Sequence, residues 1–231
     1  MDFEKKIFFK SGSNQLAGNL IHPQLENKFP IVVFLHGGGE ANKNRFRLWQ
    51  DFLVQGGLGS FAFDFTGVGE SEGSFEEGTL NQRLADAQAA LTYLRSLEVI
   101  DSGRLGLVGA SMGAHVACRL IEKEKSIKAL FISGAAAYGL EAENKKLNHE
   151  FRLTIRKENS WQESPAFRSL ENFSGALMVA SGENDEIIPK GVKEKYLSLA
   201  KGKTLILKGV GHKLLTTQGE ESAEARQKVY Q

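Results

Sequence analysis

The most constraining feature of the sequence is a series of short apolar runs that hold almost no polar residues. The runs are IVVFL, SFAFDF, RLGLVG, IKALFIS, ALMVAS and TLILK, at 31–35, 60–65, 104–109, 127–133, 176–181 and 204–208. A strand with one face in water alternates apolar and polar residues. Uninterrupted runs therefore predict strands covered on both faces, which is typical of a mostly parallel sheet.

Helical patterns fill the intervals between these runs. Apolar residues recur every three or four positions between 79 and 98, and 46–55 shows the same spacing. The residues after Met112 and 190–200 complete the series. Runs at 5–10 and 16–22 predict an antiparallel hairpin at the N-terminus. The predicted fold class is α/β, a mostly parallel central sheet with helices on both faces, in a single domain over 1–231.

Residues 138–172 interrupt the alternation of strand and helix. Four apolar residues stand at helical spacing on a charged background: Leu140, Leu147, Phe151 and Ile155. We expect 138–163 to form a small lid of one or two short helices, because ligands bind over the carboxyl ends of parallel strands. A surface helix packed on the sheet edge is the alternative. Ser164 and Pro165 then predict the N-cap and first turn of another helix.

The bulk properties of the chain exclude several classes of function. A formal net charge of +1 leaves no basic excess for nucleic acid. The longest weakly polar run, 129–140, is too short to cross a bilayer as a transmembrane segment, and the N-terminus lacks the apolar core of a signal peptide. The single cysteine, Cys118, excludes an internal disulfide and favours a reducing, cytoplasmic setting.

Three glycine clusters each follow a predicted strand. They are HGGG at 36–39, GVGESEG at 67–73 and GASMG at 109–113. The carboxyl ends of parallel strands meet at one edge of a sheet, where ligands bind. We therefore expect the three clusters to form one site.

The GASMG cluster predicts a nucleophilic serine. A strand precedes it and a helix follows, which is the context of a nucleophile elbow. Gly109 and Gly113 remove side chains that would clash in so tight a turn, and Ser111 then projects at the start of the helix. A generic strand-to-helix turn is the alternative.

A serine hydroxyl needs a base, and five histidines are candidates. His212 follows the last predicted strand and returns to the same sheet edge, so we expect it to be the base. His22 lies too early in the topology, and we expect His36 to shape its turn. His115 is expected in the core and His149 on the surface.

The base needs a carboxylate to fix its tautomer. Asp185 lies mid-loop after the strand at 176–181, between Gly182 and Pro189. We predict Asp185 as this acid, with Glu183 and Glu186 of the same loop as rivals.

The oxyanion of a tetrahedral intermediate needs hydrogen-bond donors. The backbone N–H of Met112, directly after the nucleophile, is one predicted donor. The HGGG loop supplies the second, and we expect Gly38, with Gly39 next in line, because glycine lets the backbone approach an oxygen. A phosphate-binding loop is the alternative, but no G-x-x-x-x-G-K-[ST] pattern follows.

With these residues assigned, the chain resembles the α/β-hydrolase superfamily over nearly its whole length. The order 111, 185, 212 for nucleophile, acid and base is the order of that superfamily. FDFTGVGESEG resembles its D-x-x-G-x-G-x-S loop, with matches at Asp64, Gly67, Gly69 and Ser71. Within the superfamily the chain is most similar to small, short-lidded serine esterases, such as cinnamoyl-ester and monoacylglycerol hydrolases. Glu40 departs from hormone-sensitive-lipase-like esterases, where an aromatic or aliphatic residue is common.

The resemblance implies a serine hydrolase that cleaves small-molecule carboxylic esters through an acyl-enzyme, with no metal or other cofactor. We expect its activity to rise with pH as the base loses its proton. A peptidase or amidase, a thioesterase and an acyltransferase use the same three residues and remain open. So does a homologue that senses a ligand without catalysis. The acyl group, the alcohol and the oligomeric state are not determined by the sequence.

Overall fold

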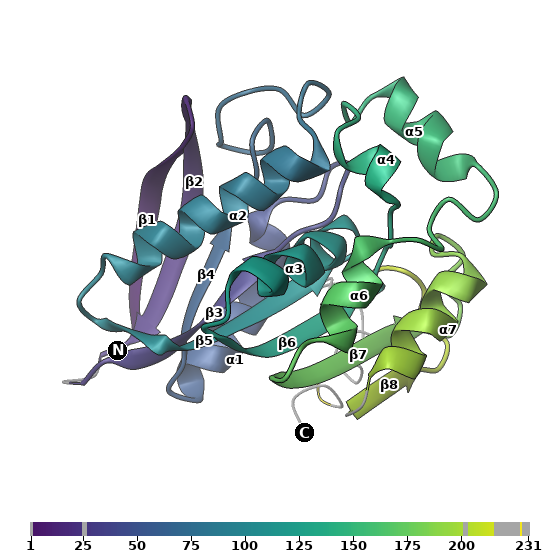
Figure 1. The fold of residues 1–231 in the computed structure, drawn as a ribbon. Coiled ribbons are helices and arrows are strands. Elements are labelled where there is room, and N and C mark those ends of the chain that lie inside the picture. Colours follow the sequence, from purple (N-terminus) through teal and green to yellow (C-terminus); the bar gives the residue numbers. More distant parts are fainter. Residues whose placement is uncertain (1, 25–26, 201–202, 215–226, 228–231) are drawn as a thin grey trace.

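One eight-stranded sheet forms the centre of the described part of the protein (Figure 1). The computed structural model describes residues 2–24, 27–200, 203–214 and 227, so the end of the predicted domain, 215–226 and 228–231, lies outside it. The strands are β1 (Asp2–Ser11), β2 (Asn14–Pro23), β3 (Phe29–Leu35), β4 (Gly59–Phe63), β5 (Ile100–Ala110), β6 (Ile127–Ser133), β7 (Ala176–Gly182) and β8 (Lys203–Leu207).

The topology of the sheet confirms the predicted fold class. The strand order is β1-β2-β4-β3-β5-β6-β7-β8. Strand β2 runs antiparallel to β1 and β4, whereas all pairs from β4 to β8 are parallel. The predicted N-terminal hairpin is β1–β2, which turns at Gly12 with a φ of +57°.

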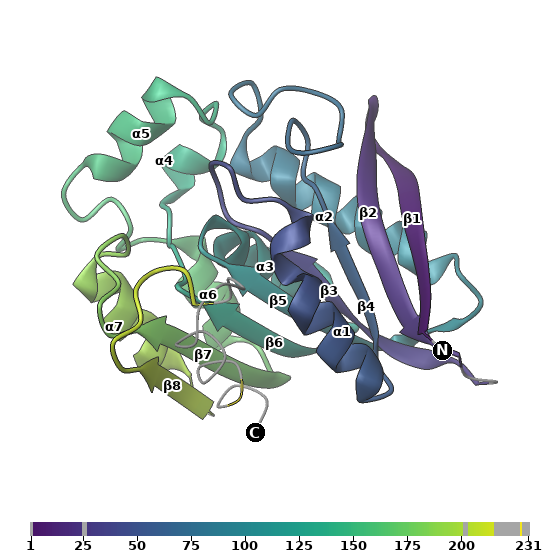
Figure 2. The ribbon, with the colours of Figure 1, turned by 180° about the vertical axis from the view of Figure 1, so that it is seen from behind.

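Helices cover both faces of the sheet, as predicted. They are the 3₁₀ helix η1 (Lys43–Phe46), α1 (Arg47–Gln55), α2 (Leu80–Arg95), α3 (Met112–Lys123), α4 (Leu140–Glu143), α5 (His149–Arg156), α6 (Pro165–Glu171) and α7 (Lys190–Leu199). Figure 1 shows α2, α3 and α6 in front of the sheet, and Figure 2, from behind, shows α1 on the opposite face. The larger apolar cluster lies under α2, α3 and α6, and a smaller one, which includes Phe46 and Trp49, lies under α1.

Two strands have bounds that differ from the apolar runs that predicted them. Strand β5 starts at Ile100, which pairs with Phe29 ahead of a register shift, although 101–104 are polar. Strand β4 stops at Phe63, because Asp64 turns inward as a fully buried carboxylate. An apolar run marks where both faces of a strand are covered, not where its backbone pairing begins or ends.

The Asp64 carboxylate anchors the loop that follows β4. It forms a buried ion pair with Lys43 Nζ at 2.5 Å and accepts the N–H groups of Lys43 and Glu70 at 2.8 and 3.1 Å. A side chain at Gly69 would overlap this carboxylate. The predicted D-x-x-G-x-G-x-S loop is thus held by a buried charge that is fully hydrogen-bonded, the condition under which such a charge is tolerated.

Helices α4 and α5 lie beyond the carboxyl ends of the strands (Figure 1). Leu147 and Phe151 pack with Ala142, Leu80 and Met112 in a separate apolar cluster. Leu140 is 62% exposed, so the apolar stripe predicted for this segment does not extend to it. Helix α6 begins at Pro165 as predicted, but Ser164 Oγ makes no capping hydrogen bond.

Across 2–24, 27–200 and 203–214, the helices are all too short or too polar to cross a membrane.

The packing of β5 against α3 predicts different outcomes for two glycine substitutions on one strand. Gly109→Ala is expected to lower the free energy of unfolding by about 2 kcal/mol or more, because of overpacking. The new Cβ would lie 2.7 Å from Ala114 Cα in the backbone of α3. Gly106→Ala is the matched control, since the nearest atom to its Cβ would be 3.5 Å away. Urea unfolding measures both, and equal losses would contradict the crowding at 109.

Candidate active site

Ser111 stands alone between the last residue of β5 and the first residue of α3. Its φ of +53° and ψ of −119° lie outside the regions that a residue with a side chain prefers. Its N–H donates to Ser133 O at 3.0 Å, and its carbonyl accepts from Ala114 and Ala136. A side chain at Gly113 would overlap the Leu35 carbonyl. The turn therefore requires glycine at 113 and holds Ser111 in a strained conformation.

The structure brings Ser111, His212 and Asp185 into one chain of contacts. His212 Nε2 lies 3.0 Å from Ser111 Oγ, and its Nδ1 lies 2.9 Å from Asp185 Oδ2. The Asp185 side chain is fully buried, whereas that of His212 is 21% exposed. A carboxylate accepts only, so Nδ1 carries the proton and Nε2 accepts from the serine hydroxyl. This arrangement can activate an alcohol as a nucleophile.

Backbone amides hold the Asp185 carboxylate in place. Oδ1 accepts the N–H groups of Ile187 and Ile188 at 2.9 and 3.1 Å, which leaves Oδ2 for His212. The rival acids, Glu183 and Glu186, are exposed. Glu183 accepts Gly209 N–H at 3.0 Å in the loop that leads to His212. The loop therefore directs only its middle carboxylate at the imidazole.

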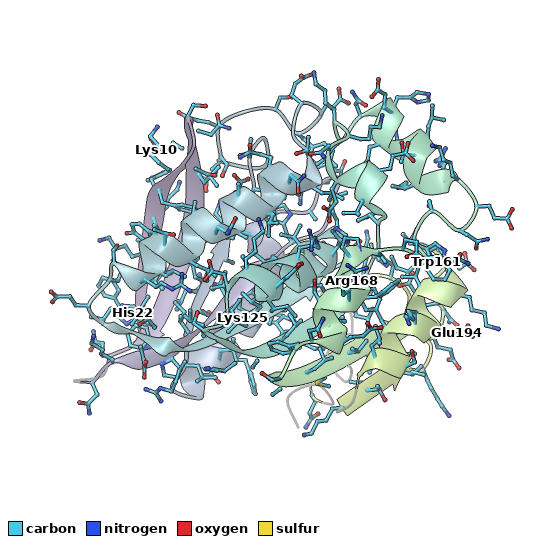
Figure 3. All side chains as sticks on the ribbon, in the orientation of Figure 1. Lys10, His22, Lys125, Trp161, Arg168 and Glu194 are labelled. Carbon is cyan, nitrogen blue, oxygen red and sulfur yellow. The ribbon has the colours of Figure 1, made fainter. Side chains whose placement is uncertain are left out.

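The other four histidines do not contact Ser111 Oγ. His22 lies among the N-terminal strands (Figure 3) and stacks on Phe29, and His149 is exposed on α5. His115 is buried, with Nε2 3.1 Å from Glu143 Oε1. Burial lowers the pKa of His115, although Glu143 opposes the shift. His36 is fully buried, and burial together with Arg83 lowers its pKa well below the ordinary value.

The HGGG loop runs past the nucleophile. A Cβ on Gly37 would lie 3.1 Å from Ser111 Cβ, and one on Gly38 would lie 3.1 Å from Met112 Cε. Met112 is the first residue of α3, and first-turn amides have no partner within their helix. Gly39 has a φ of +65° and nothing near a Cβ. Gly38, but not Gly39, lines a cavity together with Ser111.

Two cavities meet at Ser111. One, of about 640 Å³, lies between the sheet edge and the segment 138–163, and its lining combines apolar side chains such as Trp161 and Ile188 with the charged run from Arg156 to Glu158. The other, of about 480 Å³, is lined by Gly37, Gly38, Glu40, Ala41, Asn42, Arg45, Ser111, His212 and Lys213. Figure 3 shows Trp161 near the start of α7, where it packs against Gly191. The site can thus hold a group on each side of the serine.

Two residues near the site were missed by the sequence analysis. Gly134, which follows β6 with a φ of +51°, lies under the imidazole, and a Cβ there would be 3.3 Å from His212 Nδ1. The rule that singled out glycines after buried strands could have found it. Arg83 is buried under the HGGG loop, and the available signal was a charged residue inside the apolar stripe of a predicted helix. Within the described residues, no group of three His, Cys, Asp and Glu side chains could hold a metal ion.

The fold and the match to a family model define the class of protein. Residues 26–159 match the model described as serine aminopeptidase, S33, one of the hydrolase models, and this span includes Ser111. The chain is an α/β hydrolase and belongs to the serine aminopeptidase S33 family.

Several named relatives are similar in sequence to part of this chain. The quorum-quenching protein AidA of Acinetobacter baumannii is 31% identical over 48% of this chain and 37% of its own length. The esterase FrsA of Vibrio vulnificus is 29% identical over 62% of this chain and 33% of its own length. The mitochondrial palmitoyl-protein thioesterase of Homo sapiens is 26% identical over 62% of this chain and 45% of its own length. The chain spans less than half the length of these relatives.

Solved structures share the fold over nearly the whole chain. Est1E of Butyrivibrio proteoclasticus, solved with ferulic acid bound, superposes with a TM-score of 0.75 at 18% identity. The match covers 96% of this chain and 95% of that one. DcsB, solved with a substrate analogue, has a TM-score of 0.76 at 15% identity, covering 99% of this chain and 97% of that one. At these identities the likeness shows the fold.

The buried, neutral His36 predicts that folding stability falls in mild acid. The pKa of His36 is lower in the folded protein than in the unfolded chain, where it is about 6.5. Above about pH 6.5 the ring is neutral in both states and the full stability is present. As the pH falls below this value, the unfolded chain binds a proton that the folded protein does not, and the stability is lost. The expected slope is about 1.4 kcal/mol per pH unit for one histidine. Urea unfolding between about pH 7.5 and 5 measures it. His36→Asn should reduce the slope, whereas His149→Asn, on an exposed residue, should not. An unchanged slope in His36→Asn would refute the neutral state.

Proposed function

We propose that the protein is a serine hydrolase that cleaves carboxylic esters through an acyl-enzyme. Ser111 is the nucleophile, His212 the base and Asp185 the acid that orients the imidazole. The observation that carries the proposal is the unbroken chain of contacts from Ser111 Oγ through His212 to Asp185, at 3.0 and 2.9 Å. The strained φ of Ser111 supports it, because strain of this kind clusters at functional sites.

In the first half of the reaction, Ser111 Oγ attacks the ester carbonyl carbon while its proton moves to His212 Nε2. The Asp185 carboxylate stabilises the imidazolium that forms. His212 then gives the proton to the departing alkoxide, and the acyl group stays on Ser111. In the second half, water attacks the acyl carbon with His212 again as base, which releases the carboxylic acid and restores the serine.

The N–H groups of Gly38 and Met112 are the proposed donors to the oxyanion. Gly38 borders the same cavity as Ser111 and His212, and Met112 begins α3. The start of a helix adds a partial positive charge where the negative charge develops. Such preorganised donors are usually the largest electrostatic contribution to acyl transfer.

The segment 138–163 is proposed as a lid over the substrate. Tyr138, Ile155 and Asn159 of this segment line the larger cavity together with Ser111. The apolar part of its lining, which includes Trp161 and Ile188, suits an aliphatic or aromatic acyl group. The ferulic acid bound to Est1E and the names of the esterase and thioesterase relatives agree with an acyl substrate of this kind.

A peptidase or amidase is the second candidate, favoured by the description of the family as serine aminopeptidases. Esters are preferred because the named curated relatives include an esterase and a thioesterase. A small-molecule substrate and a reducing, cytoplasmic location belong to the same proposal. The location rests on a single cysteine, Cys118, which is buried and free.

A fluorophosphonate probe tests the proposed nucleophile. We expect labelling of the wild-type protein at Ser111 alone, mapped by peptide mass spectrometry, and none in Ser111→Ala. Ser102→Ala is a matched control on an exposed residue of β5 and should label normally. Matched butyryl ester, thioester and anilide substrates then separate the candidates, with the ester cleaved fastest. Labelling at another residue, or none on folded wild-type protein, would overturn the assignment.

A further inference from the structure

Arg83 of α2 is buried beneath the HGGG loop and donates to backbone carbonyls. The residue is 2% exposed, and Nη1 donates to Gly37 O at 3.1 Å and to His36 O at 3.4 Å. Its guanidinium lies over the rings of Phe65 and Phe75. Among the described residues, its Nε and Nη2 have no hydrogen-bond partner. The one polar task that this buried cation performs within the described chain is to hold the loop.

His36 donates a second hydrogen bond to the same carbonyl. Its Nε2 accepts Phe65 N–H at 3.3 Å, so in the neutral ring the proton lies on Nδ1. Nδ1 then donates to Gly37 O at 2.8 Å. The Gly37 carbonyl therefore receives two hydrogen bonds, one from a neutral imidazole and one from a cation.

We propose that Arg83 and His36 position the Gly38 N–H for the oxyanion, an inference that rests on the function proposed above. The Gly37 carbonyl and the Gly38 N–H belong to one trans peptide, in which they point in opposite directions. Two donors hold the carbonyl toward the buried side. The N–H then faces the cavity that Gly38 shares with Ser111 and His212.

The HGGG loop needs contacts from other parts of the chain to fix its conformation, because of its composition. Three successive glycines, Gly37 to Gly39, have no side chains to fix their peptide planes, and glycine has the widest choice of backbone conformations. An oxyanion donor works only if it is aimed before the reaction begins. A cation bonded to the carbonyl also polarises the peptide and strengthens its N–H as a donor. Arg83 lines neither cavity at Ser111, so it acts through the loop as a positioning residue.

A residue kept for stability alone would be arranged differently. Burying a guanidinium with two unpartnered nitrogens disfavours folding. Burial also lowers the pKa of Arg83 to about 10, although Asp86 opposes the shift. An arginine that lowers the stability of the fold is consistent with a functional role, because residues at functional sites often favour activity at the cost of stability.

The test compares Arg83→Met with Arg95→Met, the same change on the same helix. Arg95 is partly exposed in an ion pair with Glu124, far along α2 from the loop. The readouts are kcat and KM for a butyryl ester, the rate of fluorophosphonate labelling of Ser111, and the melting temperature. For Arg83→Met we expect kcat and the labelling rate to fall about 10- to 100-fold, below the loss of a whole oxyanion donor. KM should change less than about twofold, and the melting temperature should hold or rise. Arg95→Met should keep the wild-type rates.

Arg83→Lys provides a second variant that keeps the charge and should recover part of the labelling rate. An unchanged labelling rate in folded Arg83→Met, or no recovery of the rate in folded Arg83→Lys, would overturn the positioning role. The role would also be overturned if the fall in kcat came with a comparable rise in KM, or if it were explained by an equal loss of folded protein. The labelling readout is independent of the natural substrate. If the wild-type protein is labelled at Ser111 but the Arg83 variants react equally fast, only this inference fails.

A separate observation concerns the smaller cavity at Ser111. Arg45 lines it and is only partly buried, yet its Nε is buried and finds no hydrogen-bond partner in the part of the chain that the structure describes. Arg45 forms no ion pair with any described residue, whereas its neighbour Arg47 binds both Glu4 and Asp51. Burial lowers the pKa of Arg45, with no carboxylate to oppose the shift. A second cation, Lys213, lines the same cavity, and the one carboxylate of its lining, Glu40, is exposed.

We infer that this cavity binds an alcohol portion of the ester that carries a carboxylate, through Arg45. The inference rests on the proposed function and extends it to the substrate class. A partly buried guanidinium in the same cavity as the nucleophile gains from an anion that it can bind with two hydrogen bonds. The larger cavity, whose lining combines Trp161 and Ile188 with the charged run from Arg156 to Glu158, is left for the acyl group.

The test uses two butyrates of equal shape, para-carboxyphenyl butyrate and para-carbamoylphenyl butyrate. The ratio of kcat/KM for the anionic over the neutral ester should fall about tenfold in Arg45→Gln, equivalent to about 1.4 kcal/mol. Glu40→Gln should raise the ratio, and Arg47→Gln should leave it unchanged. An unchanged ratio in Arg45→Gln, or an equal fall in Arg47→Gln, would overturn the inference. If neither ester is cleaved by the wild-type protein, the ester-hydrolase proposal itself fails.

Discussion

The close approach of α3 to the end of β3 is the constraint on which the rest of the site depends. Gly113 lies so near the Leu35 carbonyl that any side chain would overlap it, and Gly109 lies against Ala114. This contact seats the turn at Ser111 beside the glycine loop that continues from β3. A residue with a side chain adopts a φ of +53° only where its surroundings enforce it. The packing of β5, α3 and β3 supplies that enforcement.

The parallel sheet makes the remaining contacts possible. The segments that carry Ser111, Asp185 and His212 follow β5, β7 and β8, and parallel strands release their chains at one edge. Each of these segments is then fixed by backbone groups. Two amides hold Asp185, Glu183 bonds Gly209 on the way to His212, and the Ser111 carbonyl accepts from Ala136. Segments that are held in this way keep short contacts between side chains without help from a ligand.

Buried charges recur around the loops and serve to fix backbone. Asp64 binds two amides and Lys43 under the loop after β4. Asp86 accepts from Thr66 N and Ser11 Oγ, which joins the same loop to the N-terminal hairpin. Arg83 differs from both, because it is the donor, its targets are carbonyls, and two of its nitrogens stay unpartnered. A buried charge that is only partly satisfied costs stability, so its place beneath the glycine loop calls for a functional reason.

The sequence by itself determined which segments along the chain are strands and which are helices. It also showed that glycines and polar side chains follow the ends of the strands. These are local properties, since periodicity follows from which faces are covered and glycine follows from where a side chain cannot fit. It also singled out Ser111, chose His212 among five histidines, and placed the acid in one loop, with Asp185 ahead of its rivals. Only the tertiary structure decided which of Glu183, Asp185 and Glu186 turns inward, where β4 and β5 end, and that Leu140 is exposed. It alone revealed Gly134 under His212 and Arg83 under the glycine loop. Those facts depend on contacts between residues far apart in the chain, such as Gly37 with Arg83, and no local pattern encodes such a contact.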